Sequence, residues 1–527
     1  MAIAYRSVLG GGGDFHVDSL TVTTMPTKTA YIKGQSLDTT GIAITGSAMG
    51  MTGNVTQYCT FSPTVLNTAG TQAITVSFGD ATTTFNVTVT QATALTITTP
   101  PTKTSYKPNE QLDLTGIVVT ASATGISEDV TAQCTFSPAD GTTLTTEGTF
   151  TLTASFDGLT ATTTYKVKDS SIYGVVWDGS SSPAWTRTDD AASFTDPQPY
   201  YSGMSGTPSS PFDNLAPWSG MVTEEDADLG TLVKIPKFWY KWTRSGSSMK
   251  LQISDGEQTG TGWHVSPAHA DRGDGTGERD YVYVGRYHCA ASTYKSTSGV
   301  LPQVNQSRGA FRTAISNLHA KAWQYDFAMW WTINMLYLVE FANWNSQAMI
   351  GGGCSETSAT SSAVYNMGST DSMPYHTGTT ATSIGATVYG ATQYRHIENL
   401  WGNCYDWCDG IYFSDADVYA INNPANFSDT TGGTKVSERP TTSNEIKAWS
   451  TPSASGLEYA LYPSEVENNT NYDTYVCDRC YYSASGVVLI VGGNYSQYQS
   501  YGAFYLSGNS AASSSSAYFG SRLQKLP

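Results

Sequence analysis

The chain has 527 residues, and its 27 lysines and arginines against 44 aspartates and glutamates give a formal net charge of -17. That balance argues against nucleic acid and anionic membranes as partners, and the length allows several domains, each with its own core. Only 13% of the residues are charged, while 50 are glycine and 33 are tyrosine, a composition typical of an all-β surface protein rather than a helical cytosolic enzyme.

The N-terminal stretch, residues 1–18, contains consecutive glycines at positions 10–13 and is expected to be a flexible leader that attaches the protein to another component. It lacks the charged region and the long apolar region of a secretory signal. The most apolar run elsewhere, residues 327–339, is interrupted by Thr332 and Asn334 and is too short to cross a bilayer. We therefore expect no membrane insertion, and a surface-type protein without an export signal is typical of a virion component assembled inside its host.

Two similar stretches follow, one starting at Leu20 (LTVTTMPTKTAYIKGQSLDTTGIAIT) and one at Leu95 (LTITTPPTKTSYKPNEQLDLTGIVVT). We predict a constant offset of 75 residues between the copies, so that Cys59 corresponds to Cys134, each buried as a small apolar side chain. Alternating apolar and polar residues within each copy predict short strands, and several short strands in a copy of this size indicate a small β-sandwich. We expect one sandwich over residues 19–91 and a second over residues 92–168.

The two copies resemble bacterial immunoglobulin-like (Ig-like) domains, of the kind found on adhesins and phage tail proteins. The resemblance implies that they act as spacers, with carbohydrate binding as the alternative. The fold class expected from these copies is mainly β and multi-domain.

From residue 169 onward the composition changes, and aromatic residues become dense. The apolar runs at residues 232–243 and 281–290 predict strands. One helix is predicted where apolar residues recur at helical spacing, and its face consists of Phe311, Ile315, Leu318 and Ala322. Asp326 is a predicted N-cap for a second helix, whose apolar stripe is Trp331, Met335, Leu338, Val339 and Ala342.

The last forty or so residues have an unusual composition. An apolar run at residues 487–491 predicts a strand, and the 26 residues from Gly493 to Tyr518 contain no Asp, Glu, Lys or Arg. Such a segment could be a low-complexity tail, but Tyr, Ser, Gly and Asn are also the residues that dominate antibody contact loops. Because Phe504, Leu506 and Phe519 are interleaved as candidate scaffold residues, we predict a contact surface.

Three motifs carry a more specific resemblance. HIENLWGNCYDWCDG at residues 396–410 resembles the LWGNVWEW core motif of the formylglycine-generating-enzyme-like branch of the C-type-lectin fold. Gly492-Gly493 and the closing GSRL at residues 520–523 resemble the borders of the variable region in target proteins of diversity-generating retroelements. The resemblance implies a C-type-lectin-like α+β domain with two helices over residues 169–527, following the two Ig-like β-sandwiches, and a variable region at about 492–523.

In that family, adenines of a template are copied with errors, so that Asn-type codons become other small or aromatic residues on a fixed scaffold. The resemblance implies that the ligand is bound through the residues of the variable segment. These are Asn494, Tyr495, Ser496, Gln497, Tyr498, Gln499, Ser500, Tyr501, Ser507, Asn509, Ser513, Ser514, Ser515 and Tyr518. We expect Tyr495, Tyr498 and Tyr501 to be the main anchors.

The function expected from these features is that of a phage tail-fibre or receptor-binding protein. Its partners would be a host-cell-surface protein or glycan, and tail or virion proteins contacted through the N-terminal region. A homotrimer on the virion would convert modest affinity into avidity. The alternative is a bacterial surface adhesin or lectin diversified by a retroelement. A formylglycine-generating oxidase is disfavoured, because its active cysteines lie between the Gly-Gly and terminal motifs, where this chain has none; we expect no enzymatic activity.

Cysteine and acidic clusters offer the remaining candidate sites. Cys404 with Cys408 and Cys477 with Cys480 have spacings that tetrahedral zinc permits. Buried free thiols are favoured for the first pair, whereas a local disulfide or a metal stays open for the second. The acidic residues 271–280 favour a solvated turn over a calcium loop. No cofactor is predicted.

Overall fold

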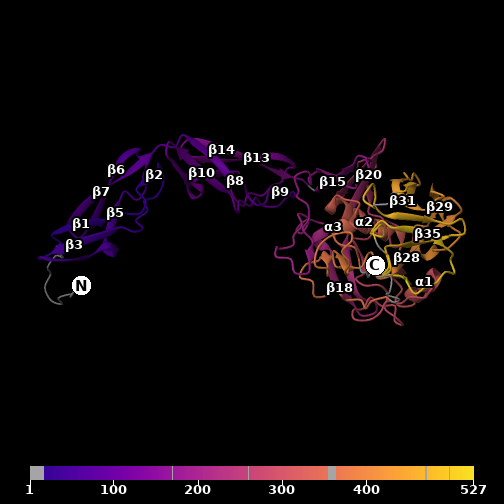
Figure 1. Ribbon diagram of the computed structural model, residues 1–527. Coiled ribbons are helices and arrows are strands. Elements are labelled where there is room, and N and C mark those ends of the chain that lie inside the picture. The colour runs from indigo at the N-terminus through magenta and orange to yellow at the C-terminus, as the bar shows by residue number, and fades with distance from the viewer. Residues whose placement is uncertain (1–16, 169, 259, 354–363, 469–471, 498) are drawn as a thin grey trace. The chain divides into compact units, whose positions relative to one another are not determined.

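The computed structural model describes residues 17–168, 170–258, 260–353, 364–468, 472–497 and 499–527. It divides into two compact units, residues 1–169 and 170–527, which are described separately below (Figure 1). The expected leader, residues 1–18, lies outside the described part except for its last two residues. Strands predominate in both units, so the expected mainly β, multi-domain fold class is confirmed. Among the described residues, no helix has the length and apolar character needed to span a bilayer.

The first repeat is a sandwich of a three-stranded and a four-stranded sheet, ordered β1-β3-β4 and β2-β7-β6-β5. Its buried core combines Ile44 of one sheet with Ile74 and Phe85 of the other. The strands are β1 (Ser19–Thr24), β2 (Ala30–Ile32), β3 (Ala43–Ala48), β4 (Met51–Asn54), β5 (Thr60–Ser62), β6 (Gly70–Phe78) and β7 (Ala81–Thr90).

The second repeat has the same two sheets, ordered β11-β10-β8 and β12-β13-β14-β9. Cys59 and Cys134 occupy equivalent, half-buried positions as free thiols. The strands are β8 (Ala94–Thr99), β9 (Ser105–Tyr106), β10 (Val118–Ala123), β11 (Ile126–Asp129), β12 (Thr135–Ser137), β13 (Gly148–Phe156) and β14 (Leu159–Val167).

The predicted constant offset between the repeats is wrong in their second halves. The starts of β3 and β10, Ala43 and Val118, are 75 residues apart, but the starts of β6 and β13, Gly70 and Gly148, are 78 apart. The loop between β12 and β13 is therefore three residues longer than its counterpart. Loops on a surface accept such insertions without disturbing the strands that they join.

The C-terminal unit opens with a five-stranded sheet ordered β16-β15-β21-β20-β22. The predicted strand at residues 232–243 is two strands, because the chain turns at Lys237 and Phe238 between β19 and β20. The bounds are β15 (Ile172–Trp177), β16 (Thr186–Asp189), β20 (Trp239–Ser245), β21 (Ser248–Ser254) and β22 (His264–Val265), with β19 (Gly230–Pro236) in a separate sheet.

The second predicted helix is present as α2 (Phe327–Phe341), and the Asp326 carboxylate accepts a hydrogen bond from the Met329 N–H at 2.8 Å, as an N-cap does. Every residue of α2 is buried, so the helix is covered on all sides and not only along the predicted stripe. It packs on β15 and β21 from one side and on β28 (Tyr405–Ser414) from the other, which places it between two sheets (Figure 1).

The first predicted helix is shorter than its sequence pattern. It forms α1 (Arg308–Ser316), whereas Ala322 belongs to β24 (Ala322–Gln324). β24 pairs with β37 (Leu523–Lys525) at the C-terminus, and this long-range pairing overrides the helical spacing. A third helix, α3 (Ser346–Met349), was not predicted.

Two further sheets have the orders β17-β25-β26-β27 and β18-β19-β23-β37-β24. The predicted strand at residues 281–290 ends at Gly285. The strands not yet given are β17 (Tyr200–Tyr201), β18 (Val222–Asp226), β23 (Tyr281–Gly285), β25 (Gly378–Thr379), β26 (Thr392–Tyr394) and β27 (Ile397–Glu398).

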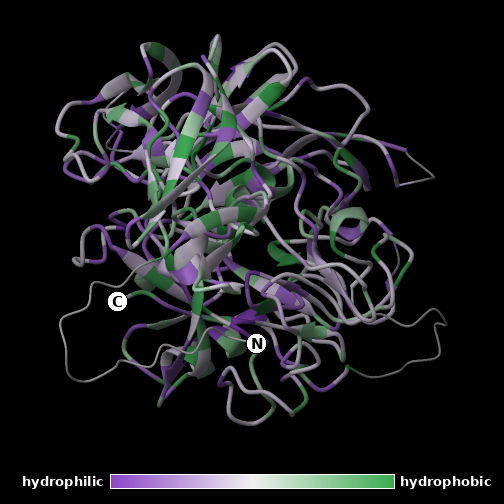
Figure 2. Cartoon of the chain, turned by 90° about the vertical axis from the view of Figure 1, so that its left-hand side faces the viewer, coloured by the Kyte–Doolittle hydropathy of each residue, from purple (hydrophilic) through white to green (hydrophobic). Residues whose placement is uncertain are grey.

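The largest sheet has nine strands in the order β30-β29-β28-β34-β35-β33-β31-β32, with β36 pairing with β28. Figure 2 shows hydrophobic and hydrophilic residues interspersed along the strands. The bounds are β29 (Asp417–Ala420), β30 (Thr434–Glu438), β31 (Asn444–Trp449), β32 (Pro463–Glu467), β33 (Arg479–Tyr482), β34 (Val488–Val491), β35 (Leu506–Ser510) and β36 (Phe519–Gly520).

Candidate functional site

The predicted Gly-Gly motif is the point where the C-terminal segment touches the 396–410 motif. The Gly402 N–H donates to the Gly493 carbonyl at 3.1 Å. Gly492 has a φ of 69°, and a Cβ atom at this position would lie 2.6 Å from the Leu400 carbonyl oxygen. Only glycine permits this left-handed conformation and close approach without strain. The two motifs are therefore parts of one backbone junction at the end of β34.

The closing motif is held by Arg522, which is fully buried. Its guanidinium donates to the carbonyls of Gly285 at 2.8 Å and Glu398 at 2.7 Å, and it lies 3.5 Å from the Asp406 carboxylate. Burial raises the pKa of Asp406 to about 6, and the neighbouring arginine opposes that shift. β36 runs parallel to β28 just before this anchor, so the segment is fixed at both ends.

A third anchor holds the middle of the segment. The buried carboxylate of Asp478 accepts hydrogen bonds from the N–H groups of Gly502 at 2.6 Å and Phe504 at 2.8 Å. The hydroxyl of Ser346 accepts from the Ala503 N–H at 2.9 Å. Burial raises the pKa of Asp478 to about 7. The Phe504 ring packs edge-on against Trp344 with 4.8 Å between centroids, which makes Phe504 the scaffold residue that the sequence predicted.

Between these anchors lies a cavity of about 300 Å³, which we call the C-terminal hollow. Tyrosine rings form one wall: the rings of Tyr405 and Tyr505 stack at 5.5 Å between centroids, and those of Tyr501 and Tyr505 lie 4.6 Å apart. The hydroxyls of Tyr481 and Tyr501 share a hydrogen bond of 2.8 Å. The lining is Tyr405, Tyr481, Ile490, Asn494, Ser496, Gln497, Tyr501, Tyr505, Ser507, Asn509, Tyr518 and Phe519.

The polar part of the lining is oriented by short local hydrogen bonds. The Asn494 carbonyl oxygen accepts from the Ser496 hydroxyl at 2.9 Å, and that of Asn509 accepts from the Ser507 hydroxyl at 2.8 Å. The Asn509 side chain is exposed, whereas Asn494 lines the hollow but is only 2% exposed. No Asp, Glu, Lys or Arg lines the hollow. Its chemistry is therefore that of uncharged hydrogen bonding combined with aromatic contact.

The structure brings together half of the residues predicted to bind a ligand. Those lining the hollow are Asn494, Ser496, Gln497, Tyr501, Ser507, Asn509 and Tyr518. Gln499 is half-buried outside the lining, and Ser513, Ser514 and Ser515 lie on the partly exposed loop before β36. Tyr498 lies outside the described residues.

Tyr495 and Ser500 differ from the expectation of exposed contact residues. Tyr495 is only 6% exposed and Ser500 only 2% exposed. The Tyr495 N–H donates to the Asn403 carbonyl at 3.0 Å, which holds its backbone against the 396–410 motif. The Ser500 carbonyl accepts from the Arg479 N–H at 3.0 Å. Phe519, predicted to be a scaffold residue, is half-buried and lines the hollow instead.

Three tyrosines of the hollow were missed by the sequence analysis. Tyr405 lies within the 396–410 motif, Tyr505 lies inside the variable segment, and Tyr481 lies on β33, which pairs in parallel with β35 so that Tyr481 is opposite Ser507. The signal available for Tyr405 was its place between the two motif cysteines. The partner of Tyr481 depends on strand order, which local patterns do not reveal.

The candidate zinc residues are placed in the interior. Cys404, Cys408, Cys477 and Cys480 are all buried, although Cys477 and Cys480 were expected in a polar loop. Burial raises the pKa of Cys408, Cys477 and Cys480, and these three are free thiols rather than a local disulfide. Among the residues that the structure describes, no group of three or more His, Cys, Asp or Glu side chains is placed to hold a metal ion.

The acidic turn at residues 271–280 is internally bonded rather than simply solvated. Arg279 binds Asp274, and Arg272 is fully buried with its guanidinium 2.7 Å from Asp326. The Arg-Gly-Asp tripeptide at residues 272–274 of this turn therefore presents no exposed arginine.

A comparison with known protein families finds a match in the first repeat. Residues 24–89 match the bacterial Ig-like domain, group 3. This match lies inside the predicted sandwich of residues 19–91, so the resemblance predicted for the first repeat is confirmed. The second repeat has the same strand order. No curated protein matches the chain.

Similar solved structures include the S-layer protein rSbsC(31-844), at 12% identity over 48% of this chain and 40% of that chain, with a TM-score of 0.14. Another is the N-terminal four Ig domains of Dscam1 isoform 9.44 with zinc, at 10% identity over 29% of this chain and 47% of that chain, with a TM-score of 0.11. The match thus spans less than half the length of either solved chain, and such TM-scores support no argument about this protein.

Proposed function

We propose that the protein is a phage tail receptor-binding protein that binds a host-cell-surface ligand in the C-terminal hollow. The observation that carries this proposal is the hollow itself. Seven of the residues predicted to bind a ligand line it together with Tyr405, Tyr481 and Tyr505, and none of its lining residues is Asp, Glu, Lys or Arg. Concave sites with aromatic walls and a few convergent polar groups are the usual form of a ligand site.

The chemistry of the lining selects the kind of ligand. Tyrosine supplies large, stiff contact area at low entropic cost, and Ser and Asn supply adaptable hydrogen bonds. An uncharged lining gains little from a charged ligand, since a buried charge needs a partner. The ligand proposed is therefore an uncharged part of a surface glycan or protein, and its binding should depend only weakly on ionic strength.

The segment has buried residues that hold its backbone, which we call the frame, and exposed residues that can contact a ligand. This division supports a diversified binding site of C-type-lectin type. Buried groups such as Asp478, Phe504 and Arg522 hold the backbone of the segment, whereas Asn509 and Tyr518 are exposed. Exposed side chains such as these two can change while the buried residues still hold the backbone. A retroelement target protein requires such a division.

The remaining parts of the chain fit the same proposal. Ig-like sandwiches are typical of surface and adhesion-type proteins, and here they would act as spacers. We propose that the N-terminal region attaches to tail or virion proteins and that the chain forms a homotrimer, so that several hollows bind at once. No catalytic role is proposed, because neither Cys nor His lines the hollow. Light scattering of the purified chain tests the trimer directly.

The alternative, a bacterial surface adhesin or lectin that uses the same hollow, is separated by gene context. Neighbouring tail genes would support the phage assignment, whereas a cellular secretion gene would contradict it. A reverse transcriptase gene beside a near-copy of the final coding segment, differing at adenines, would support diversification. Its absence would contradict diversification but not ligand binding.

Binding itself is tested with host cells. The purified full chain should adsorb to susceptible cells and block phage adsorption, and Asn509→Ala with Tyr518→Ala should abolish both effects. A matched control, Ser513→Ala with Ser515→Ala, changes exposed residues outside the lining and should behave as the unmodified chain. Equal loss in both double variants, or in neither, would overturn the proposal.

A further inference from the structure

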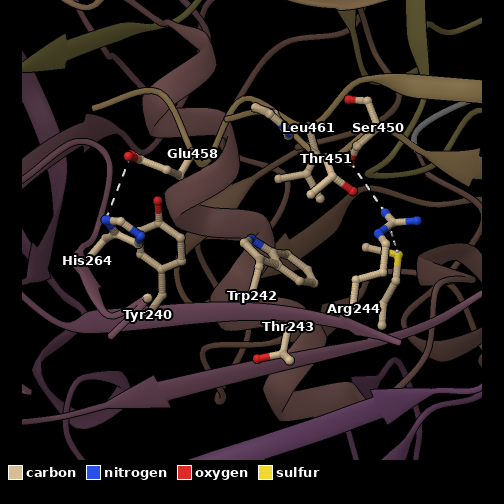
Figure 3. A pocket seen from close by; sticks show the side chains of 12 residues that line it. Tyr240, Trp242, Thr243, Arg244, His264, Ser450, Thr451, Glu458 and Leu461 are labelled. Atoms are coloured by element: carbon tan, nitrogen blue, oxygen red, sulfur yellow. Dashed lines mark hydrogen bonds and ion pairs between the residues drawn. The ribbon is translucent and has the colours of Figure 1, made fainter. Parts of the chain in front are cut away.

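A second cavity in the C-terminal unit has different chemistry and lies outside the predicted variable region. It encloses about 160 Å³, close to the volume of a single sugar ring, and we call it the Trp242 pocket. Tyr240, Trp242 and Arg244 are alternate residues of β20, so they project from one face of the strand and line the pocket in a row. Residues 450–461 close the other side (Figure 3).

The two ends of the pocket carry opposite charge. His264 and Glu458 lie beside Tyr240, with 3.8 Å between the imidazole Nδ1 and the carboxylate. Arg244 lies at the other end beside Ser450 and Thr451, with Trp242 between the two ends (Figure 3). A ligand that fits must therefore place different groups at its two ends.

Arg244 is a half-buried cation without a carboxylate partner. Its Nη2 donates to the carbonyls of Trp449 at 2.8 Å and Ser450 at 3.3 Å. Among the described arginines, only Arg244 and Arg439 lack an aspartate or glutamate oxygen within 4.0 Å. Arg439 instead donates to four backbone carbonyls. Burial lowers the pKa of the Arg244 guanidinium, a cost that an anion at this end would offset.

The middle and the opposite end define the rest of the ligand. The Trp242 indole offers an aromatic face, and its buried N–H has no hydrogen-bond partner among the described residues. Glu458 accepts hydrogen bonds but would repel a second anion. The pocket therefore suits a small ring with one carboxylate at one end and hydroxyl groups at the other.

We propose that the Trp242 pocket binds one hexuronic acid residue of a surface polysaccharide. The carboxylate would pair with Arg244, the sugar ring would lie on Trp242, and the ring hydroxyls would donate to Glu458 and contact His264. Arginine suits this role because its fork of donors matches a carboxylate. The inference does not depend on the C-terminal hollow, and it gives the protein a fixed affinity for acidic polysaccharide beside a variable site.

The test compares two probes that differ at one carbon. Methyl glucuronide carries a carboxylate where methyl glucoside carries a hydroxymethyl group. Calorimetry and ligand-detected NMR with the full chain should show glucuronide binding at least tenfold tighter than glucoside, as expected for a charge-assisted pair worth about 1.4 kcal/mol or more. Equal affinity for the two sugars, or no glucuronide binding, would overturn the proposal.

Variants locate the site. Arg244→Gln should reduce glucuronide affinity at least tenfold, whereas Lys241→Gln, on the opposite face of β20, and Asn509→Ala, in the C-terminal hollow, should not change it. Should Arg244→Gln fail to fold, Glu458→Ala replaces a partly exposed side chain and should weaken both sugars. An unchanged affinity in the folded Arg244→Gln variant, or in Glu458→Ala, would overturn the assignment. So would tighter binding of an N-acetyl amino acid, which would indicate a peptide carboxylate instead.

Discussion

The two cavities of the C-terminal unit differ in how their chemistry is attached to the fold. The lining of the C-terminal hollow has no charged side chain. Most of its polar groups belong to a segment whose backbone is held by the buried side chains of Asp478 and Arg522. The Trp242 pocket carries Arg244 and Glu458 at its ends, on a strand and a loop that also build the wall. The hollow can change its side chains and keep its frame. The pocket has one chemistry that the fold itself fixes.

Phe504→Ala should have the largest effect, because it attacks the frame beneath the hollow. The Phe504 ring is fully buried against Trp344, and truncating a buried Phe costs about 3–5 kcal/mol of unfolding free energy. Chemical denaturation of the full chain measures this. Phe519→Ala, which truncates a half-buried ring of the lining, should cost clearly less; an equal cost would remove the distinction between frame and lining.

Asp478→Ala should have the next largest effect. It leaves the Gly502 and Phe504 N–H groups without an acceptor, which costs about 1–3 kcal/mol for each unsatisfied buried group. Hydrogen exchange should show faster exchange at these two amides. Asp473→Ala removes an exposed carboxylate and serves as the control. Slow exchange in Asp478→Ala would contradict the role of this anchor.

Tyr518→Ala tests the role of an exposed residue in the lining of the hollow. Tyr518 lines the hollow and is 37% exposed, so its loss should weaken ligand binding by about 1–2 kcal/mol and change stability by less than about 0.5 kcal/mol. Binding to host cells and thermal unfolding measure the two quantities. A large loss of stability with unchanged binding would place Tyr518 in the frame.

A pH dependence of stability should distinguish the frame further. Burial raises the pKa of Asp478 to about 7, above its ordinary value. The folded state therefore favours the protonated carboxyl. Its contribution to the free energy of unfolding is fully present below the ordinary pKa of an aspartate and is lost as the pH rises through about 7. Between pH 5 and pH 8.5, the unfolding temperature of Asp478→Asn should fall less with rising pH than that of the unmodified chain. Parallel curves would contradict the assignment.

The sequence predicted the parts of the site that depend on local chemistry. Asp326 caps α2, and the Gly-Gly pair follows β34, because an N-cap and a tight glycine junction are properties of a few adjacent residues. It failed where distant segments decide. Ala322 lies in a strand because it pairs with Lys525, and Tyr481 joins the hollow because β33 lies beside β35. Tyr495 is buried beside another distant segment, since its backbone N–H donates to Asn403.

Competition for phage adsorption tests the central claim most directly. The full chain and a triple variant of the hollow, Ser496→Ala with Asn509→Ala and Tyr518→Ala, are added to susceptible cells beside a variant with Ser513→Ala, Ser514→Ala and Ser515→Ala. We expect the unmodified chain and the serine variant to block adsorption equally, and the variant of the hollow to lose this effect while it unfolds at the same temperature. Full blocking by the folded variant of the hollow would contradict the account.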